Sequence, residues 1–277
     1  MDLRKTEVDH LPRELIKLQK LRHLLLDEVK DPHKLKYKNV FGLWRGSEAP
    51  SNIGDLKQLQ TLRGIQADKH LISQLECLTQ LRSLAITNVD SSNNFGLCNC
   101  ISKISHLPWL SVKASPGNAL ELSEISPPPR HLRKLILRGS LASIPEWFTL
   151  INSLTHLYLF DSKLGADKNL IHYLHQLHNL IVLALDDAFR VPHLLFNAGD
   201  LSALRTLSIT NTAELRSMEI TRGAMPCLQL LHVQACKSLR CILGLEHLTE
   251  LNELKLKKLD VLDNSRIPKT LPCENTF

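Results

Sequence analysis

Apolar residues recur along the chain in the pattern Leu-x-x-Leu-x-Leu, as in Leu132–Leu137, Leu154–Leu159 and Leu204–Ile209. The first residue of each Leu-x-Leu pair serves as an anchor, at positions 24, 62, 84, 110, 135, 157, 183, 207, 231 and 254. Met1 takes the same place 23 residues before Leu24. Apart from one step of 38 residues, the steps between anchors run from 22 to 26 residues. A recurring step of this length predicts eleven stacked repeats.

Each Leu-x-Leu segment predicts a short strand whose leucines point into the core and whose middle residue points outward, because side chains alternate along a strand. Successive strands are expected to pair in parallel on a concave face. The return stretches carry helical spacing, as at Leu71, Leu75 and Leu78, which predicts short helices, 3₁₀ turns and loops on the convex face. The pattern is typical of a leucine-rich-repeat solenoid, an α/β horseshoe, here expected as a single domain over residues 1–277.

Three stretches depart from the regular steps. Residues 31–52 are interpreted as an irregular insertion within one repeat, and the turn-rich residues 88–100 and 115–129 as loops. The position five residues after each anchor is expected to turn inward, and it is mostly small or Cys instead of the Asn usual in such repeats. This column reads Thr6, Val29, Ala67, Val89, Ser115, Ser140, Ser162, Ala188, Thr212, Cys236 and Leu259.

Charge and composition argue against several function classes. The net charge of +6 is spread along the chain, so nucleic-acid binding is not indicated. No apolar run is long enough for a membrane span, and the charged first ten residues do not resemble a secretory signal. The seven cysteines form no C-x-x-C pair, and no Asn begins an N-x-Ser/Thr sequon. A reducing, cytoplasmic location is therefore expected.

Candidate chemical sites are few. His172, His175 and His178 have a spacing that a metal site can use, but leucines interleave with them, which favours an amphipathic return segment. Cys98 and Cys100 are too close together and lack a second pair. The sequence contains no G-x-x-x-x-G-K-[ST], G-x-S-x-G or H-E-x-x-H motif. We therefore expect no metal, no cofactor, no small-molecule substrate and no enzymatic activity.

The outward strand positions predict a recognition surface. Tyr158 is the middle residue of its strand, and the column two residues further is expected to place Arg138, Phe160 and Asp186 on neighbouring strands, about 4.8 Å apart. That second column is predicted to run Asp27, Ile65, Thr87, Lys113, Arg138, Phe160, Asp186, Thr210, Gln234 and Lys257.

Exposed aromatic side chains within a charged rim are typical of an interface hot spot, although scattered apolar groups on a sheet are also ordinary. The candidate protein-binding residues are Lys134, Arg138, His156, Tyr158, Phe160, Asp161 and Asp186. Charge reversal at Arg138 and Asp186 together with Tyr158→Ala is expected to abolish partner binding without changing thermal stability.

Several segments resemble the coiled-coil NB-ARC leucine-rich-repeat (NLR) disease-resistance proteins of plants. They are Leu3–Val8 with Leu11-Pro12, Leu18–Leu24, Leu137-Arg138-Gly139 leading to Ile144–Phe148, and Gly223–Pro226 before Leu228. The resemblance implies protein recognition in innate immunity, with a pathogen effector, a host guardee or the receptor's nucleotide-binding module as partner. The coiled-coil and nucleotide-binding modules of that family are not found in the sequence, which begins inside a repeat; a truncated gene product or a fragment is expected. The alternative is a generic cytosolic scaffold for signalling or ubiquitin-ligase assembly.

Overall fold

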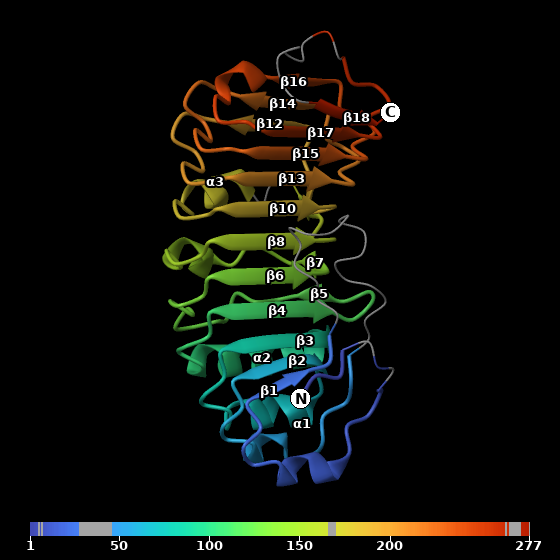
Figure 1. Cartoon of the computed structure of the whole chain (residues 1–277), viewed down its shortest axis with the longest axis vertical. Helices are drawn as coiled ribbons and strands as arrows, with labels where there is room; N and C mark the ends of the chain where they lie inside the picture. The colour runs from blue at the N-terminus through green and yellow to red at the C-terminus, as the bar shows by residue number, and fades with distance from the viewer. Residues whose placement is uncertain are drawn as a thin grey trace. The chain divides into compact units, whose positions relative to one another are not determined.

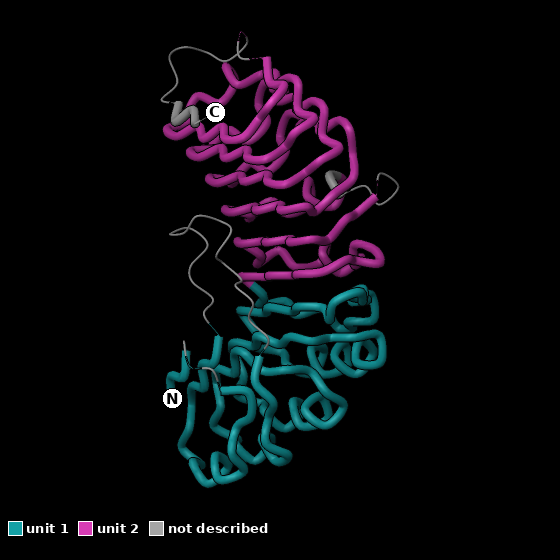
Figure 2. Tube along the Cα trace, turned by 90° about the vertical axis from the view of Figure 1, so that its right-hand side faces the viewer, with its two compact units in different colours: residues 1–132 teal, residues 133–277 magenta. Residues whose placement is uncertain are grey.

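The computed structural model describes residues 1–4, 6, 8–27, 46–165, 170–263, 265 and 273–276. The chain divides into two compact units, unit 1 with residues 1–132 and unit 2 with residues 133–277 (Figure 2). The predicted insertion at 31–52 lies largely outside the described residues, which resume at Gly46. That the repeats form a single domain stays a prediction.

Unit 1 is built on a parallel sheet whose strands follow one another in chain order (Figure 1). The strands are β1 (His23–Leu25), β2 (Thr61–Gln66), β3 (Ser83–Val89) and β4 (Trp109–Ala114). Leu24 pairs with Leu62 although 38 residues separate them, so the predicted register holds across the longest step. The return segments contain η1 (Arg13–Lys17), η4 (Ile53–Asp55), α1 (Lys69–Leu75), α2 (Ser91–Lys103) and, within the predicted loop 115–129, β5 (Ala119–Leu120).

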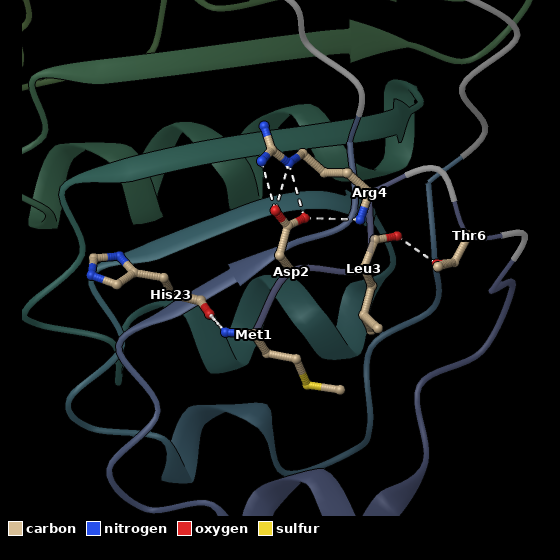
Figure 3. A network of polar contacts seen from close by, with 6 residues as sticks. All are labelled: Met1, Asp2, Leu3, Arg4, Thr6 and His23. Carbon is tan, nitrogen blue, oxygen red and sulfur yellow. Dashed lines mark hydrogen bonds and ion pairs between the residues drawn. The ribbon is translucent and has the colours of Figure 1, made fainter.

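The first residues of the chain form a parallel bridge with β1, beside which the Met1 ammonium donates to the His23 carbonyl at 2.6 Å (Figure 3). The Leu3 amide donates to the Leu25 carbonyl at 2.7 Å, and the Leu25 amide donates to the Met1 carbonyl at 3.1 Å. The Arg4 guanidinium donates hydrogen bonds to both carboxylate oxygens of Asp2 and lowers the pKa of that carboxyl to about 2. Met1 therefore lies in register with Leu24, as the repeat count predicted, but its side chain is 48% exposed and not buried like the other anchors.

Residues 88–100 are not a loop, and the prediction of one is wrong, because Ser91–Lys103 form the helix α2. Asp90 caps this helix: its Oδ1 accepts the backbone amides two and three residues further along, at 2.9 and 3.1 Å. Leu97 and Ile101 lie fully buried on its inner face. The cap and this burial offset the weak helix propensity of the Ser-Ser-Asn-Asn run that suggested a turn.

Unit 2 carries a parallel ladder from β6 to β17, and its described strands pair without a register shift (Figure 1). Its strands are β6 (Lys134–Arg138), β8 (His156–Phe160), β10 (Val182–Asp186), β13 (Thr206–Thr210), β15 (Leu230–Gln234), β17 (Glu253–Lys257) and β18 (Cys273–Thr276). Each anchor leucine from Leu135 to Leu231 pairs with the anchor of the next repeat, and all anchors from Leu135 to Leu254 are fully buried. The strand prediction is confirmed here residue by residue.

A second parallel sheet forms the return side of unit 2, in the order β12-β14-β16. These strands are β12 (His193–Phe196), β14 (Ser217–Ile220) and β16 (Cys241–Leu243). Burial alternates along β12 and β14, as expected of strands with one buried face. This second sheet is not predicted by the Leu-x-Leu pattern. The other elements are β7 (Ser140–Leu141), η5 (Glu146–Leu150), β9 (Leu164–Gly165), α3 (Leu170–His175), β11 (Phe189–Arg190) and η7 (Leu245–His247).

A left-handed residue follows each main strand of unit 2 from β6 to β17. These residues are Gly139, Asp161, Asp187, Asn211, Ala235 and Lys258, with φ between 48 and 120°. The turn directs the next residue inward, where Ser162, Ala188, Thr212 and Cys236 are fully buried. The predicted inward column is thus confirmed at these positions, whereas Thr6 is exposed, Ser115 and Ser140 are half-buried, and Val29 lies outside the described residues.

Candidate functional site

The register of β6, β8 and β10 brings the predicted recognition residues together. Tyr158 on β8 pairs with Ile136 on β6 and with Ala184 on β10. Phe160, two residues further along, pairs with Arg138 and Asp186. The prediction that Arg138, Phe160 and Asp186 lie on adjacent strands is therefore confirmed. We call the seven predicted residues, Lys134, Arg138, His156, Tyr158, Phe160, Asp161 and Asp186, the β8 patch.

The two aromatic rings of the β8 patch are buried, and the prediction that they are exposed is wrong. Tyr158 is 1% exposed and Phe160 is 4% exposed. Their rings lie nearly parallel, with centroids 6.4 Å apart, and the Lys134 ammonium stands 5.2 Å from the Tyr158 centroid. The His156 ring stacks on the Tyr158 ring, with centroids 6.5 Å apart. Neighbouring side chains thus cover rings that an alternating pattern alone places in solvent.

The charged residues of the β8 patch form its accessible part. Arg138 Nε lies 3.2 Å from Asp161 Oδ2, and both side chains are partly exposed. Asp186 is half-buried and accepts a hydrogen bond of 2.6 Å from the Asn211 amide nitrogen. Burial raises the pKa of Asp186, and the nearby charge of Asp161 adds to this shift, whereas the Asn211 bond opposes it. The accessible surface of the β8 patch is therefore a rim of positive and negative side chains around two buried aromatic rings.

The middle column of unit 2 continues from Ala184 through Ser208 and His232 to Lys255. His232 is 3% exposed, and its Nδ1 lies 3.2 Å from the Ser208 hydroxyl. Burial lowers the pKa of His232 to about 4, and the positive charge of Lys255 adds to this shift. Small side chains at Ala184 and Ser208 separate the large Tyr158 from His232.

The second predicted column breaks down in unit 1. Gln66, and not Ile65, pairs with Thr87, because Gly64 forms a bulge in β2 with φ of +95°. A further shift in the pairing of β3 with β4 lies between Ile86 and Val89. A glycine inside a strand is a known sign of a bulge, and Gly64 was the signal that the count of equal steps overlooked.

Unit 1 contains a polar arrangement that the sequence analysis missed. The Arg63 guanidinium lies 4.2 Å from the ring centroid of Trp109 and 3.0 Å from Asp27 Oδ2. Asp27 is fully buried, and its Oδ1 has no hydrogen-bond partner among the residues that the structure describes. Burial raises the pKa of Asp27, against the opposing effect of Arg63. No spacing rule pairs these residues, because Arg63 reaches Trp109 on β4 from β2, past the intervening strand β3.

The rejected metal candidates occupy ordinary structural positions. His172 and His175 lie in α3, and His175 Nε2 is 2.9 Å from Asp200 Oδ2. Burial raises the pKa of both Cys98 and Cys100 to about 11. Among the residues that the structure describes, no group of three or more His, Cys, Asp or Glu side chains is placed to hold a metal ion.

The helices in the described part of the chain are all too short or too polar to cross a membrane.

Comparisons with known proteins agree with the leucine-rich-repeat fold. Residues 1–266 match the family described as leucine-rich repeat region. Disease resistance protein RPM1 of Arabidopsis thaliana is 31% identical over 239 residues, which are 86% of this chain and 25% of that protein. Disease resistance protein RPP8 of the same plant is 25% identical over 277 residues, covering 93% of this chain and 30% of that protein. The chain therefore spans about a quarter to a third of the length of these relatives.

Among solved structures, the crystal structure of the TLR13-ssRNA13 complex matches 95% of this chain and 40% of its own, with a TM-score of 0.53 and 18% identity. At this identity the match supports the fold alone. The family match, the repeat registers and the relatives together show that the chain belongs to the leucine-rich repeat region family and resembles the disease-resistance proteins of plants.

Proposed function

We propose that this chain is a protein-recognition module of plant innate immunity that binds its partner through the charged rim of the β8 patch. The partner is a pathogen effector or a host protein that an effector targets. The immune role rests on similarity to disease resistance proteins, and the binding mode rests on the site.

One observation carries the proposal. Five side chains that bear or can gain charge, on β6, β8, β10 and the turn after β8, surround two packed aromatic rings within unit 2. They are Lys134, Arg138, His156, Asp161 and Asp186. Partly exposed charged side chains around packed aromatic rings resemble the polar rim and the apolar centre of a protein interface. An open sheet face also suits recognition better than catalysis, which requires reacting groups held in a water-excluding site.

We place this function in the cytoplasm as part of the same proposal. The six described cysteines are unpaired, and three of them are buried thiols. Free thiols are typical of proteins that work in a reducing compartment.

The test uses Arg138→Glu, which reverses a partly exposed charge and leaves Tyr158 in place. Tyr158→Ala is unsuitable because truncating a ring that is 1% exposed leaves a cavity, and we expect it to lower stability by about 3 kcal/mol. This replaces the expectation that the change leaves stability unaltered.

Partners are first collected by proximity labelling in pathogen-challenged plant tissue and then purified. Their direct affinity for the wild-type chain and for Arg138→Glu is measured by calorimetry. We expect at least a tenfold loss of affinity, which corresponds to about 1.4 kcal/mol. The control Arg222→Glu makes the same change at an exposed site in the turn after β14 and should leave the affinity unchanged. Equal affinities for wild type and Arg138→Glu would contradict the assignment of the β8 patch.

A further inference from the structure

The segment that enters the second sheet of unit 2 places two arginines side by side. Arg216 directly precedes β14 and Arg240 directly precedes β16, at equivalent positions of successive repeats. The Arg240 amide donates to the Arg216 carbonyl at 2.8 Å, and the Arg216 amide donates to the Pro192 carbonyl at 2.7 Å. Neighbouring rungs of this ladder therefore carry the two guanidinium groups, about 4.8 Å apart at the backbone.

A shallow groove opens at this edge of unit 2. One part of it has a volume of about 330 Å³ and is lined by Arg216, Lys237, Ser238, Arg240 and Val261. The three cationic side chains are exposed, and Ser238 is half-buried. An adjoining part of about 380 Å³ shares Arg216 and Ser238 with the first.

The first part of the groove has an excess of positive charge. Within the described ranges of the chain, Arg216, Lys237 and Arg240 form no ion pair. Three carboxylates lie close along the chain. Asp260, next to Val261, is exposed and forms no ion pair with a described residue, whereas the other two have other partners. Glu214 Oε1 is 3.7 Å from Arg190 Nε, and Asp263 Oδ1 accepts the Ser265 amide at 3.0 Å. Three adjacent cations without a counter-charge repel one another, and a bound anion would relieve that repulsion.

The residue types select the anion. A guanidinium group presents parallel N–H donors that match the oxygens of a phosphate, and two of them on adjacent rungs can share one phosphate. Ser238 supplies a hydroxyl donor beside them. Val261, which is 51% exposed, offers an apolar contact at the same groove. A phosphorylated side chain next to an apolar residue meets both kinds of contact, and a free phosphate ion meets only the first.

We propose that the groove of Arg216, Lys237, Ser238 and Arg240 binds a phosphorylated segment of a protein partner. Arginine clusters are a recurrent means of reading phosphorylated peptides. This site lies on the return side of unit 2, on other residues than the β8 patch, and it stands whether or not the β8 patch binds a protein.

The probe is a fluorescein-labelled peptide with one phosphoserine between two valines, and its unphosphorylated twin serves as reference. Fluorescence polarisation with the full chain measures both affinities. We expect the phosphopeptide to bind about tenfold more tightly than its twin, because a phosphate gains charge-assisted hydrogen bonds that a hydroxyl does not. The double variant Arg216→Gln/Arg240→Gln should remove that preference, and Lys237→Gln should reduce it by a smaller factor.

The matched control Arg205→Gln/Arg222→Gln removes the same charge at two exposed sites of unit 2 outside the groove and should keep the preference. Thermal melts check that each variant is folded. Equal binding of the two peptides, or an unchanged preference in the groove variant, would overturn the proposal. Inorganic phosphate is added as a competitor: displacement of the phosphopeptide at phosphate concentrations equal to the dissociation constant of the peptide would also overturn it, because the peptide would then add nothing to the phosphate.

Discussion

Units 1 and 2 share the same buried Leu-x-Leu anchors but differ in how regular their sheets are. In unit 1 the register shifts twice, once in β2 and once in β3, and helices α1 and α2 fill the return side. In unit 2 the described strands from β6 to β17 pair in constant register, and a second parallel sheet lies on the return side.

The difference between the two return sides follows from the spacing of buried residues in the return segments. In α1, Leu71, Ile72 and Leu75 are buried with helical spacing, whereas β12 and β14 alternate between exposed and buried residues. The anchors thus determine where a strand begins, and the segment between anchors determines whether the other side is helical or extended. Four predictions test this contrast.

The largest expected effect concerns the bulge in unit 1. A Cβ on Gly64 would lie 2.6 Å from the Asp27 backbone nitrogen, and φ is +95°. Combining the strain of a left-handed alanine with overpacking against backbone, we expect Gly64→Ala to lower the free energy of unfolding by about 4 kcal/mol. Urea denaturation followed by circular dichroism measures the change.

Gly117→Ala is the matched control in unit 1, because φ there is +80° and a Cβ would meet nothing within 4 Å. Only the backbone strain applies at this site, so the expected loss is about 1 kcal/mol. Equal losses of stability for the two variants would show that the contact between the added Cβ and the Asp27 backbone does not add to the cost of Gly64→Ala.

The next effect concerns the buried ion pair of unit 1. Asp27 is fully buried beside Arg63, so Arg63→Met leaves a carboxyl without its cation. We expect a loss of about 3 kcal/mol near neutral pH, because removing one partner of a buried pair leaves the other charge uncompensated. The double variant Arg63→Met/Asp27→Asn should recover part of the loss in the same denaturation assay. No recovery would mean that the effect comes from the lost stacking on Trp109.

The repeat period was sufficient to predict most of the strands and their parallel order, because burial of Leu-x-Leu pairs depends only on neighbours in the stack. It was not sufficient for the bulge or for α2. One glycine at a positive φ displaces the pairing by a residue, and one Asp cap turns a Ser-Asn run into a helix. Both depend on local backbone geometry that apolar spacing does not report.

The candidate site was predicted in part for a similar reason. Register alone places Arg138, Phe160 and Asp186 on adjacent strands, and register follows from the anchors. Exposure depends on how the side chains of neighbouring strands pack, such as Lys134 of β6 over the Tyr158 ring, and alternation along one strand cannot report it. Arg216 and Arg240 directly precede return strands and lie outside the Leu-x-Leu columns and the inward column, so the register of the anchors does not bring them together.

The third prediction concerns acid. The pKa of His232 in unit 2 is about 4 in the folded chain, against an ordinary value of 6.5. As the pH falls, His232 is therefore protonated in the unfolded chain before it is protonated in the folded chain. Its contribution to stability is full above pH 6.5 and is lost progressively toward pH 4. For one such group we expect a loss of about 2 kcal/mol between pH 7 and pH 5.

Asp27 in unit 1 should act in the opposite direction, because burial raises its pKa and the folded chain then holds the proton more tightly. Hydrogen exchange resolved by mass spectrometry, corrected for intrinsic rates, should show protection falling at pH 5 in unit 2 more than in unit 1. His232→Gln should flatten the response of unit 2, whereas His178→Gln at an exposed site should not. Equal acid responses of the two units would contradict this difference.

The smallest expected effect is that of Arg138→Met, the counterpart in unit 2 of Arg63→Met. The side chains of Arg138 and Asp161 are 32% and 46% exposed, against 21% and 0% for Arg63 and Asp27. Water already solvates the exposed pair, so its loss should lower stability by only about 0.5 kcal/mol. Parallel urea titrations of the two variants measure the ratio, and a loss as large as that of Arg63→Met would show that burial does not decide the strength of these pairs. If the small value holds, the rim of the β8 patch contributes little to folding. A loss of partner binding on changing Arg138 then reports on the interface itself.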